Sequence, residues 1–188
     1  LNTFIFHRVL PEPDPIFPDE IDAKRFNEIL SWITQWFNII PFNEAVERLQ
    51  KNSLPPRAAA ITFDDGYEDN YSIAMPLLKK HGVSATFFIA TGFLDGGRMW
   101  NDSIIEAVRQ TKKTSLDLAS IGLETVPVSS LQEKRAAIAK LIGAMKYDQL
   151  DLRRAKSDSI GHLAEVELPT GLMMASKQVQ QMRAQGMQ

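Results

Sequence analysis

The sequence contains no cysteine and only three histidines among its 188 residues. A chain without cysteine forms no disulfide, no thiolate metal site and no cysteine nucleophile. Any metal ion must therefore be bound by histidine and carboxylate side chains. The lack of cysteine is compatible with a reducing or an oxidising compartment, so it does not indicate where the protein works.

Basic clusters and long apolar runs are missing too. The 21 Lys and Arg residues against 23 Asp and Glu residues give a formal net charge of −2, and basic residues form only short pairs such as Lys79-Lys80. This balance disfavours a nucleic-acid partner bound mainly through phosphates. The longest apolar runs, at residues 58–63 and 85–90, fall far short of the roughly 20 residues that a membrane-spanning helix needs. We therefore predict no transmembrane segment.

The chain begins at Leu1 rather than Met, and residues 3–6 already have the pattern of a strand. A signal peptide would need a charged region followed by an apolar region, and neither precedes this strand. We expect the natural N-terminus to lie upstream, which leaves export undecided.

The remaining composition is that of a globular domain, with 44% hydrophobic and 23% charged residues, enough for one sizeable core. The first hundred residues alternate between strand and helix patterns. Strands are predicted at residues 3–6, 39–40, 58–63 and 85–90, and helices at residues 22–37, 43–49 and 70–81. This alternation predicts an α/β fold with a parallel sheet flanked by helices.

Capping signals support these helices. Asp22 and Asn43 are candidate N-caps, and Gly82 follows the last helix. Pro76 lies inside that helix and is expected to bend it, because proline lacks the N–H of a regular turn.

After Trp100 the pattern becomes helical, with helices predicted at residues 102–110, 130–147, 151–165 and 176–185. Ser130 and Glu133 have the spacing of a capping box, and Gly186 follows the last helix in the C′ position. About residues 96–175 are therefore interpreted as a helical insertion after the third main strand.

The ends of the predicted strands carry the polar residues. In parallel α/β folds, ligands bind beyond the carboxyl ends of the strands. The strands end in Asp64-Asp65-Gly66, His7-Arg8 and Thr91-Gly92. Two adjacent carboxylates repel unless a cation or a shared proton relieves them, and Gly66 permits the tight turn that would aim them. In a surface hairpin such residues would indicate only a turn and a helix cap, but the wholly apolar strand favours a functional site.

A resemblance to the polysaccharide deacetylase family, which includes chitin and peptidoglycan N-acetylglucosamine deacetylases, runs through four stretches: Ile61-Thr-Phe-Asp-Asp-Gly-Tyr67, Asn70-Tyr71, Pro76-Leu-Leu-Lys-Lys-His-Gly82 and Ala85-Thr-Phe-Phe88. Two further stretches resemble one bacterial branch of this family, Phe6-His7-Arg8-Val9 and Met99-Trp100-Asn101-Asp102, so the similarity covers essentially the whole chain. The family fold is an irregular (β/α) barrel. The resemblance thus implies an incomplete barrel of this kind with the helical insertion.

The resemblance also implies a hydrolase that removes N-acetyl groups, or in some members O-acetyl groups, from a polysaccharide by means of a divalent metal, often zinc. By position, Asp64 resembles the catalytic base and Asp65 resembles a metal ligand. A metal with an open coordination position activates water and polarises the acetamide carbonyl, while a nearby carboxylate accepts the proton of the water.

The expected partner is an acetylated polysaccharide or oligosaccharide. Aromatic rings stack on sugars and polar side chains bind hydroxyl groups. On this basis the candidate substrate-binding residues are His7, Tyr67, Trp100 and Asn101. For each of them, ordinary packing at the barrel rim is the alternative interpretation.

The family's other two metal ligands are histidines in a His-Ser/Thr-x-x-His motif, which this sequence lacks. His81 at a helix C-terminus and His162 near Glu165 are interpreted as surface residues. Residues 176–188 resemble the helix that precedes the missing motif. We therefore expect residues 1–188 to be the N-terminal portion of one deacetylase catalytic domain, inactive or nearly so alone. Family members often act at the cell envelope, which is the expected location by analogy.

Two other function classes stay open. A magnesium phosphohydrolase would also use strand-end aspartates, although no glycine-rich phosphate loop and no phosphate-binding Lys or Arg is evident beside Asp64. A non-catalytic carbohydrate-binding or interaction module is expected if the gene ends at Gln188. Its sugar binding would be indifferent to a chelator.

Overall fold

The computed structural model describes residues 1–188, which form a mixed α/β fold of two compact units. Unit 1 consists of Leu1–Asp14, Asp19–Gly97 and Gly171–Gln188, and unit 2 consists of Pro15–Pro18 and Arg98–Thr170. Each unit has its own hydrophobic core. None of the helices combines the length and hydropathy that crossing a bilayer would require.

Unit 1 contains a four-stranded sheet in which every pairing is parallel, as the sequence predicts. Its strands are β1 (Asn2–Phe6), β2 (Asn38–Ile39), β3 (Ala58–Phe63) and β4 (Thr86–Phe87). The central strand β3 pairs with the whole of β1 on one side. On the other side, β2 pairs with its beginning and β4 pairs with its end. The four strands form an open sheet, and no strand pairing closes them into a barrel.

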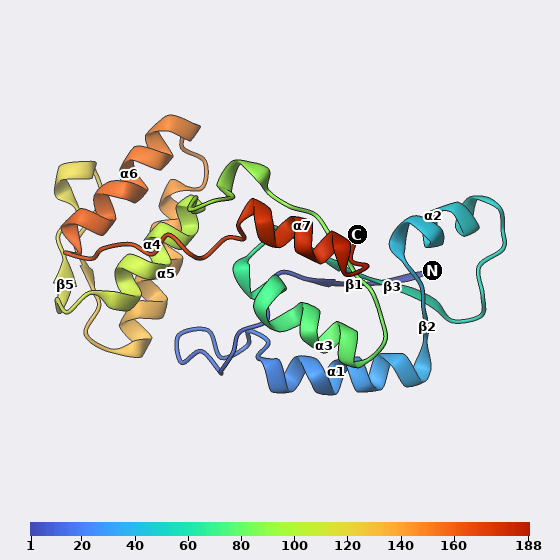
Figure 1. The fold of residues 1–188 in the computed structure, drawn as a ribbon. Helices are drawn as coiled ribbons and strands as arrows, with labels where there is room; N and C mark the ends of the chain where they lie inside the picture. The colour runs from blue at the N-terminus through green and yellow to red at the C-terminus, as the bar shows by residue number, and fades with distance from the viewer. The chain divides into compact units, whose positions relative to one another are not determined.

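The helical segments of unit 1 are α1 (Ala23–Trp36), α2 (Phe42–Gln50), the π-helical turn η1 (Asn70–Ala74), α3 (Met75–Lys80), the 3₁₀ turn η2 (Thr91–Phe93) and α7 (Ser176–Ala184). Helices α1 and α3 lie side by side along the sheet (Figure 1). The carboxylate of Asp22 caps α1 as predicted, because it accepts a hydrogen bond from Arg25 N at 2.7 Å. The apolar stripe Phe26, Leu30 and Ile33 of α1 then packs into the core of this unit.

The core of unit 1 is aromatic. The ring of Phe63, at the end of β3, lies 5.3 Å from Phe6, 5.7 Å from Phe26 and 4.9 Å from Phe87 between centroids. Offset and edge-to-face ring pairs at these distances stabilise a core beyond the area that they bury. The end of β3 is therefore packed against three neighbouring aromatic rings.

Two local predictions were wrong. Pro41, not Asn43, precedes α2 as its N-cap, because the Pro41 carbonyl accepts the first hydrogen bond of the helix from Ala45 N. The strand predicted at 85–90 is reduced to Thr86–Phe87, because only these residues pair with β3 before the chain enters η2.

The helix predicted at 70–81 consists of η1 followed directly by α3. The N–H of Met75 bonds to the carbonyl of Asn70, five residues back, which widens the turn. Pro76 lies in the first turn of α3, where a missing N–H leaves the fewest hydrogen bonds unmade. The irregularity therefore precedes the proline as a π-turn, a feature that is frequent at functional sites.

Unit 2 contains α4 (Trp100–Gln110), β5 (Ser115–Leu116), the 3₁₀ turn η3 (Ala119–Ile121), β6 (Val126–Pro127), α5 (Leu131–Met145) and α6 (Leu150–Leu163). The capping box of Ser130 and Glu133 at the start of α5 is confirmed. The short antiparallel pair of β5 and β6 was not predicted, because two-residue strands give no readable period.

Unit 2 also includes a distant segment, Pro15–Pro18. Ile16 is buried in its core, and Arg135 of α5 donates from Nε to the Ile16 carbonyl at 2.9 Å. The Arg109 guanidinium lies 5.9 Å from the centroid of the Phe17 ring. Sequence patterns gave no indication of this assignment, because the segment has no periodicity of its own.

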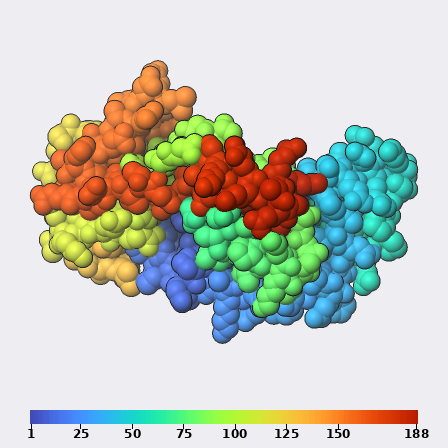
Figure 2. All heavy atoms as spheres, viewed as in Figure 1, coloured from blue at the N-terminus to red at the C-terminus, as the bar shows by residue number.

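The C-terminal helix α7 belongs to unit 1 and lies against η1 and α3, as the red and green atoms in Figure 2 show. Tyr71 donates from its hydroxyl to Gln181 at 2.8 Å, and Lys79 donates to Gln185 at 2.6 Å. Asp95 supplies the cap of α7, since its carboxylate accepts from both the backbone N and the Oγ of Ser176. Gly186 follows the helix with a φ of +89°, as predicted for the C′ position.

Candidate active site at the end of strand β3

The candidate site begins where β3 leaves the sheet. All six residues of β3 are buried, and the hydrogen bonds of its ladder continue one step beyond it. Asp64 N donates to Phe6 O at 2.9 Å, and Phe88 N donates to Phe63 O at 2.8 Å. The strand end is thus held from both sides before the chain turns.

The turn that follows has two successive residues in the left-handed region, Asp65 with a φ of +73° and Gly66 with a φ of +84°. An L-residue in this region costs about 1–2 kcal/mol, so the backbone at Asp65 is strained. A Cβ atom at Gly66 would lie 2.9 Å from Cγ2 of Ile89, so only glycine fits there without displacement. Strain of this kind concentrates at functional sites, where the surrounding structure holds it in place.

Neighbouring backbone groups hold the turn. Ala90 N donates to the Asp65 carbonyl and Met174 N donates to the Gly66 carbonyl, each at 3.0 Å. The Asp64 and Asp65 side chains are both partly exposed, so they are accessible to a ligand. The structure therefore places the two predicted carboxylates on one strained, hydrogen-bonded turn at the carboxyl end of the central strand.

His7 is brought to the same place from the end of β1. Its Nε2 atom lies 3.9 Å from Oδ2 of Asp64, with side-chain exposures of 58% for His7 and 39% for Asp64. Water screens a pair this exposed, so its contribution to stability is small. The proximity instead provides an imidazole beside a carboxylate, as the strand order predicts.

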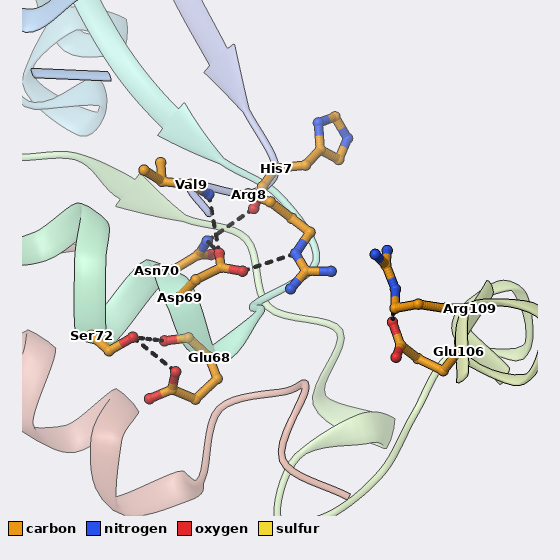
Figure 3. Close-up of polar contacts among 9 residues, drawn as sticks. All are labelled: His7, Arg8, Val9, Glu68, Asp69, Asn70, Ser72, Glu106 and Arg109. Carbon is orange, nitrogen blue, oxygen red and sulfur yellow. Dashed lines mark hydrogen bonds and ion pairs between the residues drawn. The ribbon is translucent and has the colours of Figure 1, made fainter. Parts of the chain in front are cut away.

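A buried polar network adjoins the backbone of His7 (Figure 3). Arg8 donates from Nε to Asp69 Oδ2 at 2.8 Å, and Val9 N donates to Asp69 Oδ1 at 3.1 Å. Asn70 donates from Nδ2 to the His7 carbonyl at 2.9 Å. Burial raises the pKa of the Asp69 carboxyl above its ordinary value, while the Arg8 guanidinium and the Val9 N–H act in the opposite direction.

Sequence reasoning missed the role of Asp69 and Asn70. They are 6% and 0% exposed, and their partners lie about sixty residues earlier in the chain. An acidic residue before a predicted helix and an amide at its first position read as an ordinary helix start. The available signal was their position shortly after the Asp64-Asp65-Gly66 turn and opposite the polar end of the first strand.

Tyr67 is buried, with 5% of its surface exposed. The Arg8 guanidinium lies over its ring at 4.4 Å from the centroid, a cation–π contact. Tyr67 also forms an isolated antiparallel bridge with Met173. The ring is thus packed within unit 1 and covered by Arg8 on one face.

The other two predicted substrate residues, Trp100 and Asn101, are the first residues of α4 in unit 2. Trp100 packs against the core of that unit, and the Arg153 guanidinium covers its ring at 4.8 Å. The other two histidines are His81, in unit 1, and His162, in unit 2. His81 ends α3, with Nε2 3.1 Å from Asn27 Oδ1, and His162 is exposed on α6. No three His, Asp or Glu side chains come together in an arrangement that could bind a metal ion.

Comparisons with known proteins identify a family. The model of the polysaccharide deacetylase family matches residues 51–143, a range that includes the whole of β3 and the carboxylate turn. The chain belongs to the polysaccharide deacetylase family. The carboxylate turn therefore lies within the part of this chain that matches the family.

Individual relatives cover only parts of the chain. YxkH of Bacillus subtilis (strain 168), assigned to the same family, is 37% identical over 71 residues, or 37% of this chain and 25% of that protein. The poly-beta-1,6-N-acetyl-D-glucosamine N-deacetylase of Staphylococcus aureus (strain MSSA476) is 28% identical over 119 residues, or 62% of this chain and 40% of that protein. These matches cover less than half the length of the relatives.

Among solved structures, a de-N-acetylase from Aggregatibacter actinomycetemcomitans matches with a TM-score of 0.51 and 17% identity. The match covers 100% of this chain and 52% of that one. At this identity the likeness concerns the fold alone. It supports the mixed α/β architecture of residues 1–188 and their correspondence to about half of a deacetylase structure.

Proposed function

We propose that this protein contributes the catalytic carboxylates of a polysaccharide N-deacetylase, a hydrolase of carbon–nitrogen bonds that are not peptide bonds. Its substrate is an acetylated polysaccharide or oligosaccharide. N-acetyl groups are the proposed target, and O-acetyl groups are the alternative. The single observation that carries this proposal is the strained turn at Asp64, Asp65 and Gly66. It presents two carboxylates at the end of a buried parallel strand, within the range that matches the family.

In the proposed reaction a water molecule adds to the acetamide carbonyl, the C–N bond breaks, and acetate and a free amine are released. Asp64 accepts the proton of the attacking water as general base. The partial exposure of Asp64 suits this role, since water and substrate must both reach the carboxylate. His7 lies beside Asp64 and is proposed to contact the substrate at the same opening.

The side chains of residues 1–188 do not by themselves fit a complete metal site. A catalytic zinc ion takes three protein ligands and keeps one open position. Asp65 offers one carboxylate ligand, but no three suitable side chains converge. We propose that Asp65 is one ligand of a divalent metal, with zinc the expected ion, and that two histidines outside residues 1–188 complete the site. Such a metal would polarise the acetamide carbonyl when bound.

We also propose that residues 1–188 are the N-terminal portion of one catalytic domain, in which about residues 96–175 are a helical insertion into an irregular (β/α) barrel. The side of β4 that faces away from β3 supports this proposal. Gln188 N donates to Ala85 O at 3.0 Å, and Phe87 N donates to Gln188 O at 2.7 Å. These two bonds are the pattern of a parallel strand pair.

Exposed apolar side chains point the same way. Ile5 of β1 and Phe88 after β4 are 61% and 50% exposed, although both belong to the sheet region of unit 1. A hollow of about 470 Å³ beside β4 is lined in part by Phe42, Phe88 and Met187. A further strand on β4 would cover Phe88 and this hollow, whereas Ile5 lies on β1 at the opposite side of the sheet. Residues 1–188 alone are therefore expected to show little or no deacetylase activity.

The decisive test measures the release of acetate and free amine from poly-β-1,6-N-acetylglucosamine and from chitin oligomers. It uses residues 1–188 alone and the same residues within a complete deacetylase domain. In the complete domain, Asp64→Asn and Asp65→Asn should each lower the rate by about 10²–10⁴-fold. Asparagine tolerates the left-handed region, so Asp65→Asn leaves the turn intact.

Glu68→Gln is the matched control, because Glu68 follows the same turn and its carboxylate accepts instead from Ser72 and Gln178. Its rate should stay close to that of the wild type. Full activity after Asp65→Asn would contradict the proposal. Sugar binding without hydrolysis, unchanged by a chelator, would indicate a carbohydrate-binding module instead.

A further inference from the structure

The segment that carries His7 is held to the carboxylate turn by side chains rather than by the sheet. The ladder between β1 and β3 ends with the bond from Asp64 N to Phe6 O. Beyond it, the His7 carbonyl accepts from Asn70 Nδ2 at 2.9 Å, and Val9 N donates to Asp69 Oδ1 at 3.1 Å. Two consecutive side chains thus continue the attachment of β1 past the end of its strand pairing.

These two side chains start from a well-anchored part of the chain. Glu68 N donates to the Leu172 carbonyl at 2.8 Å, immediately before them. Asn70 begins the π-turn η1, and Tyr71 donates to Gln181 of α7. Asp69 and Asn70 are therefore flanked by residues that are hydrogen-bonded to segments other than β1. This attachment allows them to hold the segment His7–Val9 in place.

Arg8 completes the arrangement. Its Nε donates to Asp69 Oδ2 at 2.8 Å, and its guanidinium lies on the Tyr67 ring. Figure 3 shows that Arg8 bends from the end of β1 towards Asp69, while the imidazole of His7 points away from this network. The alternation of side chains along the extended segment thus directs Arg8 inward and leaves His7 on the exposed side, 3.9 Å from Asp64.

We propose that Asp69 and Asn70 are positioning residues that hold the segment His7–Val9 against the carboxylate turn and thereby place the His7 imidazole beside Asp64. This inference rests on the proposed function of Asp64 as the base. Neither residue contacts Asp64 in the hydrogen-bond network; both act through the backbone of residues 7–9.

The chemistry of Asn70 is specific for this task. Its Nδ2 atom donates to the His7 carbonyl and to Asp69 Oδ1, whereas its buried Oδ1 atom has no hydrogen-bond partner. An aspartate of the same shape would turn an oxygen towards the His7 carbonyl and the Asp69 carboxylate, and would repel both. Asn70→Asp therefore removes the attachment with almost no change in volume.

The test uses the chain of residues 1–188 and the imidazole signals of its three histidines in ¹H–¹³C NMR spectra. In Asn70→Asp and in Asp69→Asn, the His7 signals should move, while those of His81 and His162 stay in place. His81 lies in the same unit, on Asn27, and so reports on general loss of structure there. Glu68→Gln is the control that changes a neighbouring carboxylate without a bond to residues 7–9.

The proposal is overturned if both variants fold and leave the His7 signals where Glu68→Gln leaves them. It is equally overturned if His81 moves as far as His7, because the effect is then a general loss of packing. If Asn70→Asp does not fold, Asn70→Ser replaces it, since serine removes the bond to the His7 carbonyl without adding a charge.

A second measurement separates this inference from the proposed function. In a complete, active domain, Asn70→Asp should lower kcat by about 10²-fold, the effect of misplacing a reacting group, with KM close to the wild-type value. A wild-type domain that releases no acetate refutes the proposed function, and the NMR result then still decides whether Asp69 and Asn70 position His7.

Discussion

The two units of this molecule follow local folding rules to different degrees. Unit 2 has a regular capping box on α5 and, among non-glycine residues, a positive φ at Glu165. Unit 1 has positive φ values at Asn52, Arg57, Asp65 and Asp95, and a π-turn. Departures from local preference gather in the unit that carries the candidate site, where tertiary contacts maintain them. Unit 2 by comparison has fewer departures from regular backbone geometry.

The largest expected effect tests whether the two cores are independent. Phe63→Ala in unit 1 should cost about 3–5 kcal/mol, and Leu141→Ala in unit 2 about 2–5 kcal/mol, because both side chains are fully buried. Hydrogen exchange followed in α1 and α5 should show each substitution weakening protection mainly in its own unit. Equal loss in both helices from either substitution would show one cooperative core instead.

A pair of glycine substitutions compares the turns of the two units. Gly66 and Gly122 both have positive φ, so alanine at either costs about 1–2 kcal/mol. At Gly66 the new Cβ also meets Ile89 Cγ2 at 2.9 Å, whereas at Gly122 nothing lies within 4 Å. Denaturant unfolding should therefore show the larger loss for Gly66→Ala. Ile89→Ala in the same chain should recover part of the difference, and equal losses at the two glycines would contradict this explanation.

Helix caps are local features, so removing a cap should cost about the same stability in both units. Asp22 accepts from Arg25 N in unit 1, and Ser130 accepts from Glu133 N in unit 2. Replacing either by alanine should cost about 0.5–2 kcal/mol, measured as a shift in thermal unfolding. Asp22→Asn and Ser130→Thr should retain most of the stability. A much larger loss at Asp22 would mean that this residue does more than cap α1.

The smallest expected effect concerns pH and two carboxylates of unit 1. Hydrogen bonds from Ser176 lower the pKa of Asp95 in the folded state. Asp95 therefore stabilises the folded state at pH values above its ordinary pKa of 3.8, and this stabilisation is lost as the pH falls through the lower folded pKa. Burial raises the pKa of Asp69, so its pH dependence is the opposite. Its contribution to the stability of the folded state is complete below pH 3.8 and declines as the pH rises through the folded pKa.

Unfolding measured as a function of pH distinguishes the two carboxylates. Asp95→Asn should remove part of the stability loss on acidification, and Asp69→Asn should remove part of the decline above pH 3.8. Glu165→Gln, in unit 2, serves as a control at an exposed carboxylate. Identical pH profiles for wild type and both aspartate variants would contradict these assignments.

The residues near the site show how far sequence reasoning reaches. The turn at Asp64, Asp65 and Gly66 was predictable because it directly follows a wholly apolar strand, and the family resemblance rests on the same residues. The nearness of His7 followed from the rule that parallel strands end at one edge. The network of Arg8, Asp69 and Asn70 was not predicted, since its members are about sixty residues apart and each has an ordinary local explanation.

By itself, the sequence determined the helices, the parallel sheet, the family and the two strand-end carboxylates, because these depend on periodicity, capping and short motifs that act over a few residues. Only the tertiary structure decided that Pro15–Pro18 packs with the helical unit, that Arg8 covers Tyr67, and that two buried side chains hold His7 beside Asp64. These features arise from contacts between distant segments, whose geometry is set when the core of each unit packs.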